Sequence, residues 1–168
     1  RLGEASGPWE SVAISPSERR IAAFMDPGEL RVFDSQSGKL LKTHSIGFSR
    51  NDSWPLPVWS DDEESVWVCE RVPGNPVTYR LSEVFVNTTP SRVIADRLEH
   101  VVNGVVVSPD GKYVACRRFA FHDRRTQADW IVFHRSGAGI YCEIDGRPAR
   151  TTGIFSPDSR SFWLAGGG

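Results

Sequence analysis

The sequence has no run of about 18 consecutive apolar residues, the minimum for a membrane-spanning helix. It also lacks a G-x-S-x-G elbow, a glycine-rich phosphate loop and an H-E-x-x-H motif, and its four histidines are scattered. We therefore expect no membrane span and no enzyme activity. The chain begins without Met and ends in three glycines after a strand-like segment. We interpret it as a piece of a longer protein and make no prediction about its compartment.

The sequence also has few cysteines and almost no net charge. The three cysteines, an odd number, match no zinc spacing. Cys69, Cys116 and Cys142 each lie in an apolar or β-rich segment, so they are predicted to be small core residues, with a redox or metal role as the alternative. The net charge of -1 predicts no general attraction to nucleic acid or to an anionic membrane. We expect no cofactor, no metal site and no nucleic-acid partner.

No segment keeps an apolar period of 3.6 residues, so almost no helix is expected. The composition is instead rich in turn formers and in strand formers. It includes 15 glycines, 11 prolines and 11% aromatic residues, six of them Trp. This mixture is typical of many short strands joined by tight turns, so the sequence predicts an all-β fold.

One pattern occurs four times: an apolar strand, a turn that begins with Ser, and a second apolar strand. The four copies are VAISPSERRIAAF, PVWSDDEESVWVC, VVVSPDGKYVAC and GIFSPDSRSFWLA. Their turn serines, Ser15, Ser60, Ser108 and Ser156, are separated by 45, 48 and 48 residues. A period of roughly 40–50 residues is typical of four-stranded propeller blades.

The third copy, Ser108-Pro109-Asp110-Gly111, has the residue types that a tight turn requires. Proline presets φ at the second position and glycine accepts a positive φ at the fourth, so the segment predicts a tight hairpin. The innermost strands are predicted at about 11–15, 57–60, 101–107 and 152–156. Two more strands complete each of the first three periods, at 29–34 and 39–45, at 76–81 and 91–96, and at 128–134 and 139–145.

The stretch LRVFDSQSGKLLKTH resembles the third and fourth strands of a WD repeat, and SPDGKYVAC resembles its first hairpin. Phe33 replaces the Trp of the Trp-Asp pair before Asp34, so the chain is more similar to the looser WD-like β-propellers. These include the propellers of the periplasmic Tol system and of prolyl-oligopeptidase-like enzymes. The resemblance implies an all-β propeller of four-stranded antiparallel blades, with about three and a half blades present. The implied blades are 11–46, 57–96, 101–146 and a first hairpin at 152–165.

The resemblance implies a rigid, non-enzymatic platform for a protein or peptide partner. The alternatives are a substrate-gating propeller of a prolyl-oligopeptidase-like hydrolase and a sensor propeller fused to a signalling domain. A partial ring exposes two apolar blade faces. We therefore expect that the remaining blades or another chain are needed to close the ring, and that the isolated chain aggregates or oligomerises.

Two charged segments lie in expected connections. The acidic run 61–64 falls in the first-hairpin turn of the second blade and is predicted to be a solvated turn, with a cation site as the alternative. The basic segment 117–127 links the second and third strands of the third blade and is longer than a simple hairpin needs. It is interpreted as an irregular solvated loop whose Phe residues cap the core, with a binding loop as the alternative.

Propeller topology places the basic segment on the same face as the link 46–56 between the first two blades, and the acidic run on the opposite face. The candidate binding residues on the shared face are Phe48, Arg50, Trp54, Arg118, His122, Arg124 and Arg125. Arginine and tryptophan are enriched among the residues that dominate interface energies. The sequence therefore predicts a partner that is acidic or rich in aromatic residues. The alternative for Trp54 is that it packs beneath its own loop.

Overall fold

The computed structural model describes residues 9–25, 28–47, 56–88, 90–99, 102–122, 125–137, 139–144 and 152–165. For residues 9, 10, 102, 103, 119–122 and 125–129 only the backbone is described. These ranges contain 14 strands and no helix, and hence no helix that could cross a membrane. The predicted all-β class is confirmed.

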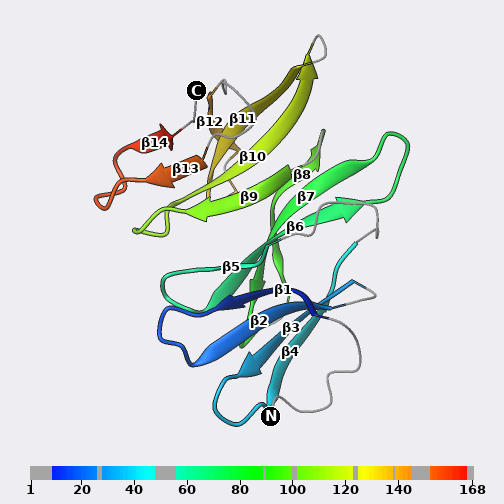
Figure 1. Ribbon diagram of the computed structural model, residues 1–168, viewed down its shortest axis with the longest axis vertical. Coiled ribbons are helices and arrows are strands. Elements are labelled where there is room, and N and C mark those ends of the chain that lie inside the picture. The colour runs from blue at the N-terminus through cyan, green and yellow to red at the C-terminus, as the bar shows by residue number, and fades with distance from the viewer. Residues whose placement is uncertain are drawn as a thin grey trace.

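Three antiparallel four-stranded sheets and one hairpin follow one another along the chain (Figure 1). The first sheet holds β1 (Trp9–Ile14), β2 (Arg20–Met25), β3 (Glu29–Asp34) and β4 (Leu40–Ser45). The second holds β5 (Val58–Trp59), β6 (Ser65–Val72), β7 (Thr78–Phe85) and β8 (Arg92–Leu98). The third holds β9 (Val102–Val107), β10 (Tyr113–His122), β11 (Arg125–His134) and β12 (Ile140–Ile144). The hairpin is formed by β13 (Thr152–Phe155) and β14 (Phe162–Ala165).

The sheets pack face to face because their middle strands are apolar on both faces. Successive residues of a strand point to opposite faces of the sheet. On β6, Val66 therefore joins a buried cluster with Phe24 of the first sheet. Its neighbour Trp67 joins a second cluster with Val114 and Ile131 of the third sheet. The second sheet is thus covered on both sides, as expected for a blade between two others.

The cysteines lie in strands, and all three are free thiols. Cys69 and Cys116 are buried in the cluster between the second and third sheets. Burial raises the pKa of Cys116 to about 12 and that of Cys69 well above its ordinary value. Both are therefore neutral core residues, as predicted. Cys142 is half-buried against a smaller cluster, and burial raises its pKa as well.

The hairpin β13–β14 buries one face and exposes the other. Phe155 and Phe162 pack against Trp130 of the third sheet. Ile154 and Trp163, which are register partners, are 57% and 55% exposed. The hairpin thus presents exposed apolar side chains on the face away from the third sheet.

Candidate functional site

The four predicted serine turns share one construction. Each serine is buried, and its Oγ accepts the backbone N–H of the residue five positions later at 2.9–3.1 Å. In the last three turns, the same hydroxyl donates to the aspartate two positions later at 2.6–2.8 Å. The fourth position has a positive φ throughout, as predicted for Gly111, but Glu18, Glu63 and Ser159 adopt it without being glycine.

Turns of neighbouring sheets are bonded to one another. In the second turn, the Glu63 carboxylate accepts both the backbone N–H and the hydroxyl of Ser17 in the first turn, the hydroxyl bond measuring 2.6 Å. In the last turn, the Ser159 hydroxyl accepts the backbone N–H of Asp110 in the third turn at 2.9 Å. The turns therefore fix one sheet to the next at this end of the molecule.

The acidic run 61–64 is a turn whose residues Asp61, Asp62 and Glu64 are exposed, as expected of a solvated turn. Asp62 also accepts hydrogen bonds from the Ser60 hydroxyl and from the Glu64 N–H, and its second oxygen lies 3.5 Å from Nη1 of Arg135. Burial acts to raise the pKa of Asp62, but the hydrogen bonds and the charge of Arg135 bring it below its ordinary value. Within the described part of the chain, no three His, Cys, Asp or Glu residues gather as metal ligands.

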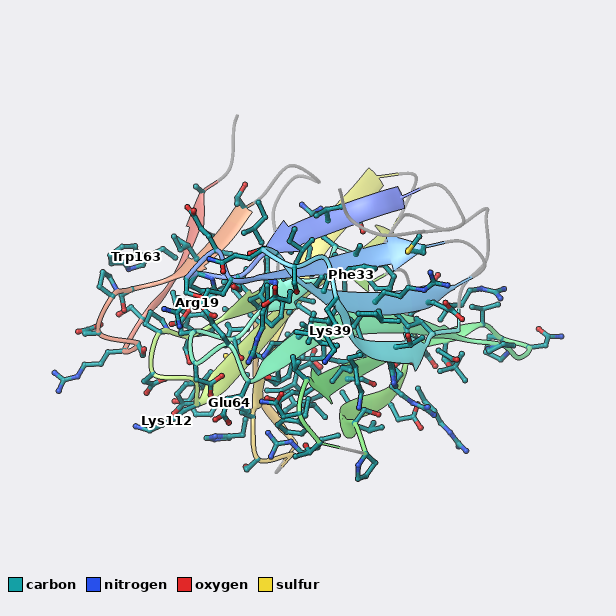
Figure 2. The ribbon with its side chains drawn as sticks, turned by 90° about the horizontal axis from the view of Figure 1, so that it is seen from below. Arg19, Phe33, Lys39, Glu64, Lys112 and Trp163 are labelled. Carbon is teal, nitrogen blue, oxygen red and sulfur yellow. The ribbon has the colours of Figure 1, made fainter. Side chains whose placement is uncertain are left out.

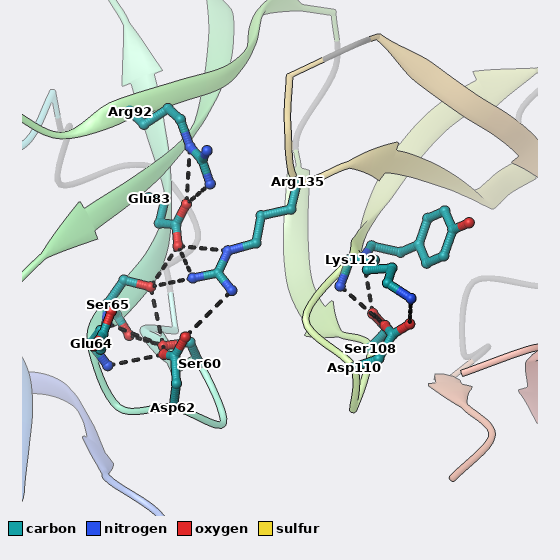
Figure 3. A network of polar contacts seen from close by, with 11 residues as sticks. Ser60, Asp62, Glu64, Ser65, Glu83, Arg92, Ser108, Asp110, Lys112 and Arg135 are labelled. Carbon is teal, nitrogen blue, oxygen red and sulfur yellow. Dashed lines mark hydrogen bonds and ion pairs between the residues drawn. The ribbon is translucent and has the colours of Figure 1, made fainter. Parts of the chain in front are cut away.

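Glu83 on β7 is a completely buried carboxylate, with 0% of the residue exposed. Its Oε1 accepts the Ser65 hydroxyl at 2.7 Å and Nε of Arg135 at 2.9 Å, and its Oε2 accepts Nε of Arg92 at 3.1 Å (Figure 3). Arg92 begins β8 of the same sheet, whereas Arg135 follows β11 of the next. A buried carboxylate is tolerated only with such partners. Arg135 and Glu83 therefore form a clamp between the second and third sheets.

Besides Glu83 and Asp62, the Trp67 ring and the third turn lie beside the Arg135 side chain of the clamp. Its guanidinium lies over the Trp67 ring, 5.9 Å from the centroid. Its Nη1 would be 3.0 Å from a Cβ placed on Gly111, so the third turn approaches it closely. Burial acts to lower the pKa of Arg135, but the hydrogen bonds and charges of Glu83 and Asp62 together outweigh it, and the pKa is raised. Arg135 therefore stays protonated.

A groove of about 730 Å³ lies between the third sheet and the hairpin β13–β14. Aromatic rings line it, among them Tyr113, Tyr141, Phe155 and Phe162. The Tyr113 and Tyr141 rings are 4.9 Å apart, and Tyr141 is 58% exposed. The groove is therefore an open aromatic surface at the next interface along the chain.

The predicted loop 117–127 is wrong, because most of it is strand. β10 and β11 pair continuously from Tyr113↔His134 to His122↔Arg125. Pairing satisfies the backbone hydrogen bonds of this long connection, which a charged loop would leave to water. Within the described residues, β9 pairs with β10 only as far as Arg118, and β12 pairs with β11 only as far as Trp130. Residues 119–122 and 125–129 therefore form a two-stranded arm beyond the four-stranded sheet (Figure 1).

The described residues include only three of the seven candidate binding residues. Phe48, Arg50, Trp54 and Arg124 lie outside the described residues. His122 and Arg125 face each other in register at the end of the arm. Arg118 is half-buried at its base, with Nη2 3.7 Å from Oε2 of Glu143 on β12.

The described start of the link 46–56 lies at the expected end of the sheets. Gly47 accepts the backbone N–H of Arg71, near the end of β6. That end of β6 corresponds to the end of β10 from which the arm extends. The topology thus places link and arm at one end, while the candidate site itself stays a prediction.

The sequence analysis did not single out the clamp residues Glu83 and Arg135, nor Arg92, which also binds Glu83. The repeat contained a signal for them. In the second sheet, the residue seven positions after the turn serine pairs in register with Glu83. In the first and third sheets, the residue seven positions after the turn serine pairs with Val32 and with Val132. A carboxylate at a position that is otherwise apolar indicates a buried ion pair.

No family model and no curated protein matches the sequence, but solved structures resemble the fold. One comes from a study of two prolyl endopeptidases: 15% identity, TM-score 0.66, over 94% of this chain and 24% of that chain. Another is the β-propeller domain of the trilobed protease from Pyrococcus furiosus: 10% identity, TM-score 0.66, over 90% of this chain and 46% of that chain. A third is the Swd1 β-propeller domain from Myceliophteria thermophila: 12% identity, TM-score 0.61, over 91% of this chain and 48% of that chain.

The chain thus spans less than half of each of these three structures. At such identities the likeness establishes the fold and nothing finer. The fold is a β-propeller, of which this chain forms part of a ring.

Proposed function

We propose that this propeller segment is a non-enzymatic platform for a protein or peptide partner, and that the arm is its contact element. The observation that carries the proposal is the extension of β10 and β11 beyond β9 and β12. Within the described part of the chain, each strand of the arm pairs only with the other. The outer edges of such a ribbon present N–H and C=O groups that an extended peptide can pair with.

The chemistry of the arm sequence favours an acidic partner. The arm includes His122 and Arg125, Arg124 lies between them in the sequence, and Arg118 stands at the base of the arm. Arginine binds carboxylates through a planar fork of donors. A two-stranded ribbon is only marginally stable by itself in water, so the arm gains stability from a partner that pairs with it.

Peptide display on the immobilised chain tests this proposal. The unmodified chain is expected to enrich acidic or aromatic peptides. The double variant Arg124→Glu with Arg125→Glu is expected to enrich such peptides at least tenfold less, since it reverses the charge at the arm. The matched control is Arg19→Glu with Lys39→Glu. Both residues are exposed and belong to turns at the other end of the sheets (Figure 2). Identical peptide sets from the arm variant and the unmodified chain would exclude the arm.

A second candidate is the substrate-gating propeller of a prolyl-oligopeptidase-like hydrolase. The similarity to a prolyl endopeptidase and to the propeller of the trilobed protease favours it. The complete gene sequence distinguishes the two candidates. A serine hydrolase domain encoded beside this propeller would support the second candidate and overturn the platform.

A further inference from the structure

The end of the sheets opposite the arm carries a concavity of about 410 Å³ between the second and third sheets. Its lining residues are Arg92, Lys112, His134, Arg135 and Ser136. Four are of basic type and the fifth carries a hydroxyl, while no carboxylate is in the lining. Carboxylates outside the lining already pair with three of the cations, Glu83 with Arg92 and Arg135 and Asp110 with Lys112. An anion would therefore use the donors that these pairs leave free.

The fold brings these residues together from two sheets. Arg92 begins β8 of the second sheet, while Lys112 belongs to the serine turn before β10 of the third. Arg135 and Ser136 follow β11, and the backbone N–H of Arg135 donates to the Lys112 carbonyl at 2.8 Å. The His134 ring packs 4.9 Å from the Tyr113 ring. Figure 3 shows Lys112 on the turn across from Arg135.

The cations keep donors available for a ligand. Glu83 lies beneath the concavity and binds Arg92 only through Nε and Nη2. Among the described residues, Nη1 of Arg92 and the Ser136 hydroxyl make no hydrogen bond. Nζ of Lys112 lies 3.2 Å from Asp110, but the lysine side chain is 73% exposed. An exposed pair of this kind is weak, so Lys112 can turn to a competing anion.

We propose that this concavity binds a phosphate group. The Nη1 N–H groups of Arg92, which Glu83 leaves free, donate to phosphate oxygens, Lys112 contributes a point charge, and Ser136 adds a neutral donor. A phosphate presents three strong acceptor oxygens and up to two charges, which uses these donors more fully than the two oxygens of a carboxylate. The clamp holds Arg92 and Arg135 in place before the ligand arrives. The site is at the other end of the sheets from the arm, so it does not depend on the platform proposal.

Titration of the full chain with inorganic phosphate at constant ionic strength, followed by amide and imidazole NMR shifts, tests the site. Binding is expected to move the signals of His134 and Ser136. Lys112→Ala should weaken it about fivefold, as for one charge-assisted hydrogen bond at an exposed lysine. Lys39→Ala is the matched control, since Lys39 is an exposed lysine in a turn at the same end of the first sheet. This control should leave the affinity unchanged.

Three results would overturn the proposal. The first is equal phosphate affinity for Lys112→Ala and the unmodified chain, with an unchanged melting temperature. The second is an equal shift with potassium chloride, which would mean screening alone. The third is an equal affinity for acetate, which would make the concavity a carboxylate site. Arg92→Lys gives a second check: it keeps the charge near Glu83 but removes the Nη1 donors, and should weaken phosphate binding about threefold.

Discussion

Two successive interfaces of this propeller segment are built differently. Between the second and third sheets, Trp67, Val114 and Ile131 are buried and the Glu83–Arg135 clamp closes the edge. Between the third sheet and β13–β14, the place of Glu83 is taken by Val132, and an aromatic groove of about 730 Å³ stays open. The first of these interfaces lies between two four-stranded sheets, whereas the second is formed with the two described strands β13 and β14. The two interfaces thus differ in whether a charged pair or aromatic rings lie at this edge.

Arg135→Ala is expected to have the largest effect on the interface between the second and third sheets. It removes one of two arginines from the fully buried Glu83. The expected loss is about 3 kcal/mol in the free energy of unfolding, because an uncompensated buried charge is left behind. Urea unfolding measures it. The control Arg160→Ala lies in an exposed turn beside the open groove and should change stability by less than about 0.5 kcal/mol. Equal losses in both variants would mean that the clamp does not seal the interface.

Replacing the carboxylate as well should recover most of that loss. Glu83→Val introduces the residue that the first and third sheets already hold at this position. In the double variant Glu83→Val with Arg135→Ala no buried charge remains, and Arg92 is partly exposed to solvent. We expect the double variant to unfold within about 1 kcal/mol of the unmodified chain. A loss equal to the sum of the two single variants would show that the two residues are not coupled.

The cysteines report on the two interfaces independently of stability. Cys69 and Cys116 lie inside the sealed interface, whereas Cys142 is half-buried and lines the open groove. Thiol reactivity requires access and the thiolate, and burial raises the pKa of Cys116 to about 12. Alkylation at pH 8, located by mass spectrometry, should therefore modify Cys142 at least tenfold faster than the other two. In Arg135→Ala the difference should shrink as the sealed interface opens more often. Equal rates in the unmodified chain would contradict the comparison.

Acidification should weaken the turns at both interfaces. The Lys112 N–H and the Ser108 hydroxyl bind the Asp110 carboxylate and lower its pKa to about 2 from an ordinary 3.8. A carboxyl whose pKa is lowered by folding contributes stability above pH 3.8 and loses it as the pH falls toward 2. The same sign holds for Asp62 and Asp158, whose pKa values are also lowered. Carboxyl NMR titration should place the Asp110 midpoint near pH 2, and Ser108→Ala should raise it. A midpoint near 3.8 in the unmodified chain would contradict the hydrogen bonding described.

The fold was predictable because its signal is repeated. The Ser-turn pattern returns at near-constant spacing, and each copy is fixed by local chemistry at the serine and at the fourth turn position. The arm was not predictable from the same reasoning, because charged residues alternate with phenylalanine there and the apolar pattern that marks a strand is lost. The clamp depends on a contact between Glu83 and Arg135, 52 residues apart in the sequence. Only alignment of the repeats, with Val32 and Val132 against Glu83, indicates it.

The smallest expected effect comes from the fourth turn position, where the turn beside the clamp differs from the first turn. Gly111, next to Arg135, has a φ of 67°, and Glu18 has a φ of 62° with a side chain that makes no hydrogen bond or ion pair in the described part of the chain. A left-handed conformation costs a residue with a Cβ about 1 kcal/mol, whereas glycine adds about 0.5 kcal/mol of unfolded-state entropy. Glu18→Gly should therefore raise the free energy of unfolding by about 0.5 kcal/mol, measured by urea unfolding. Ser159→Gly is the contrast, because it also removes the hydroxyl that accepts the Asp110 N–H, and its free energy of unfolding should not rise.

Gly111→Ala should lower the free energy of unfolding by more than about 1 kcal/mol, since its Cβ would also meet the Arg135 guanidinium at 3.0 Å. If Glu18→Gly destabilises the chain, the left-handed turn is not a source of strain.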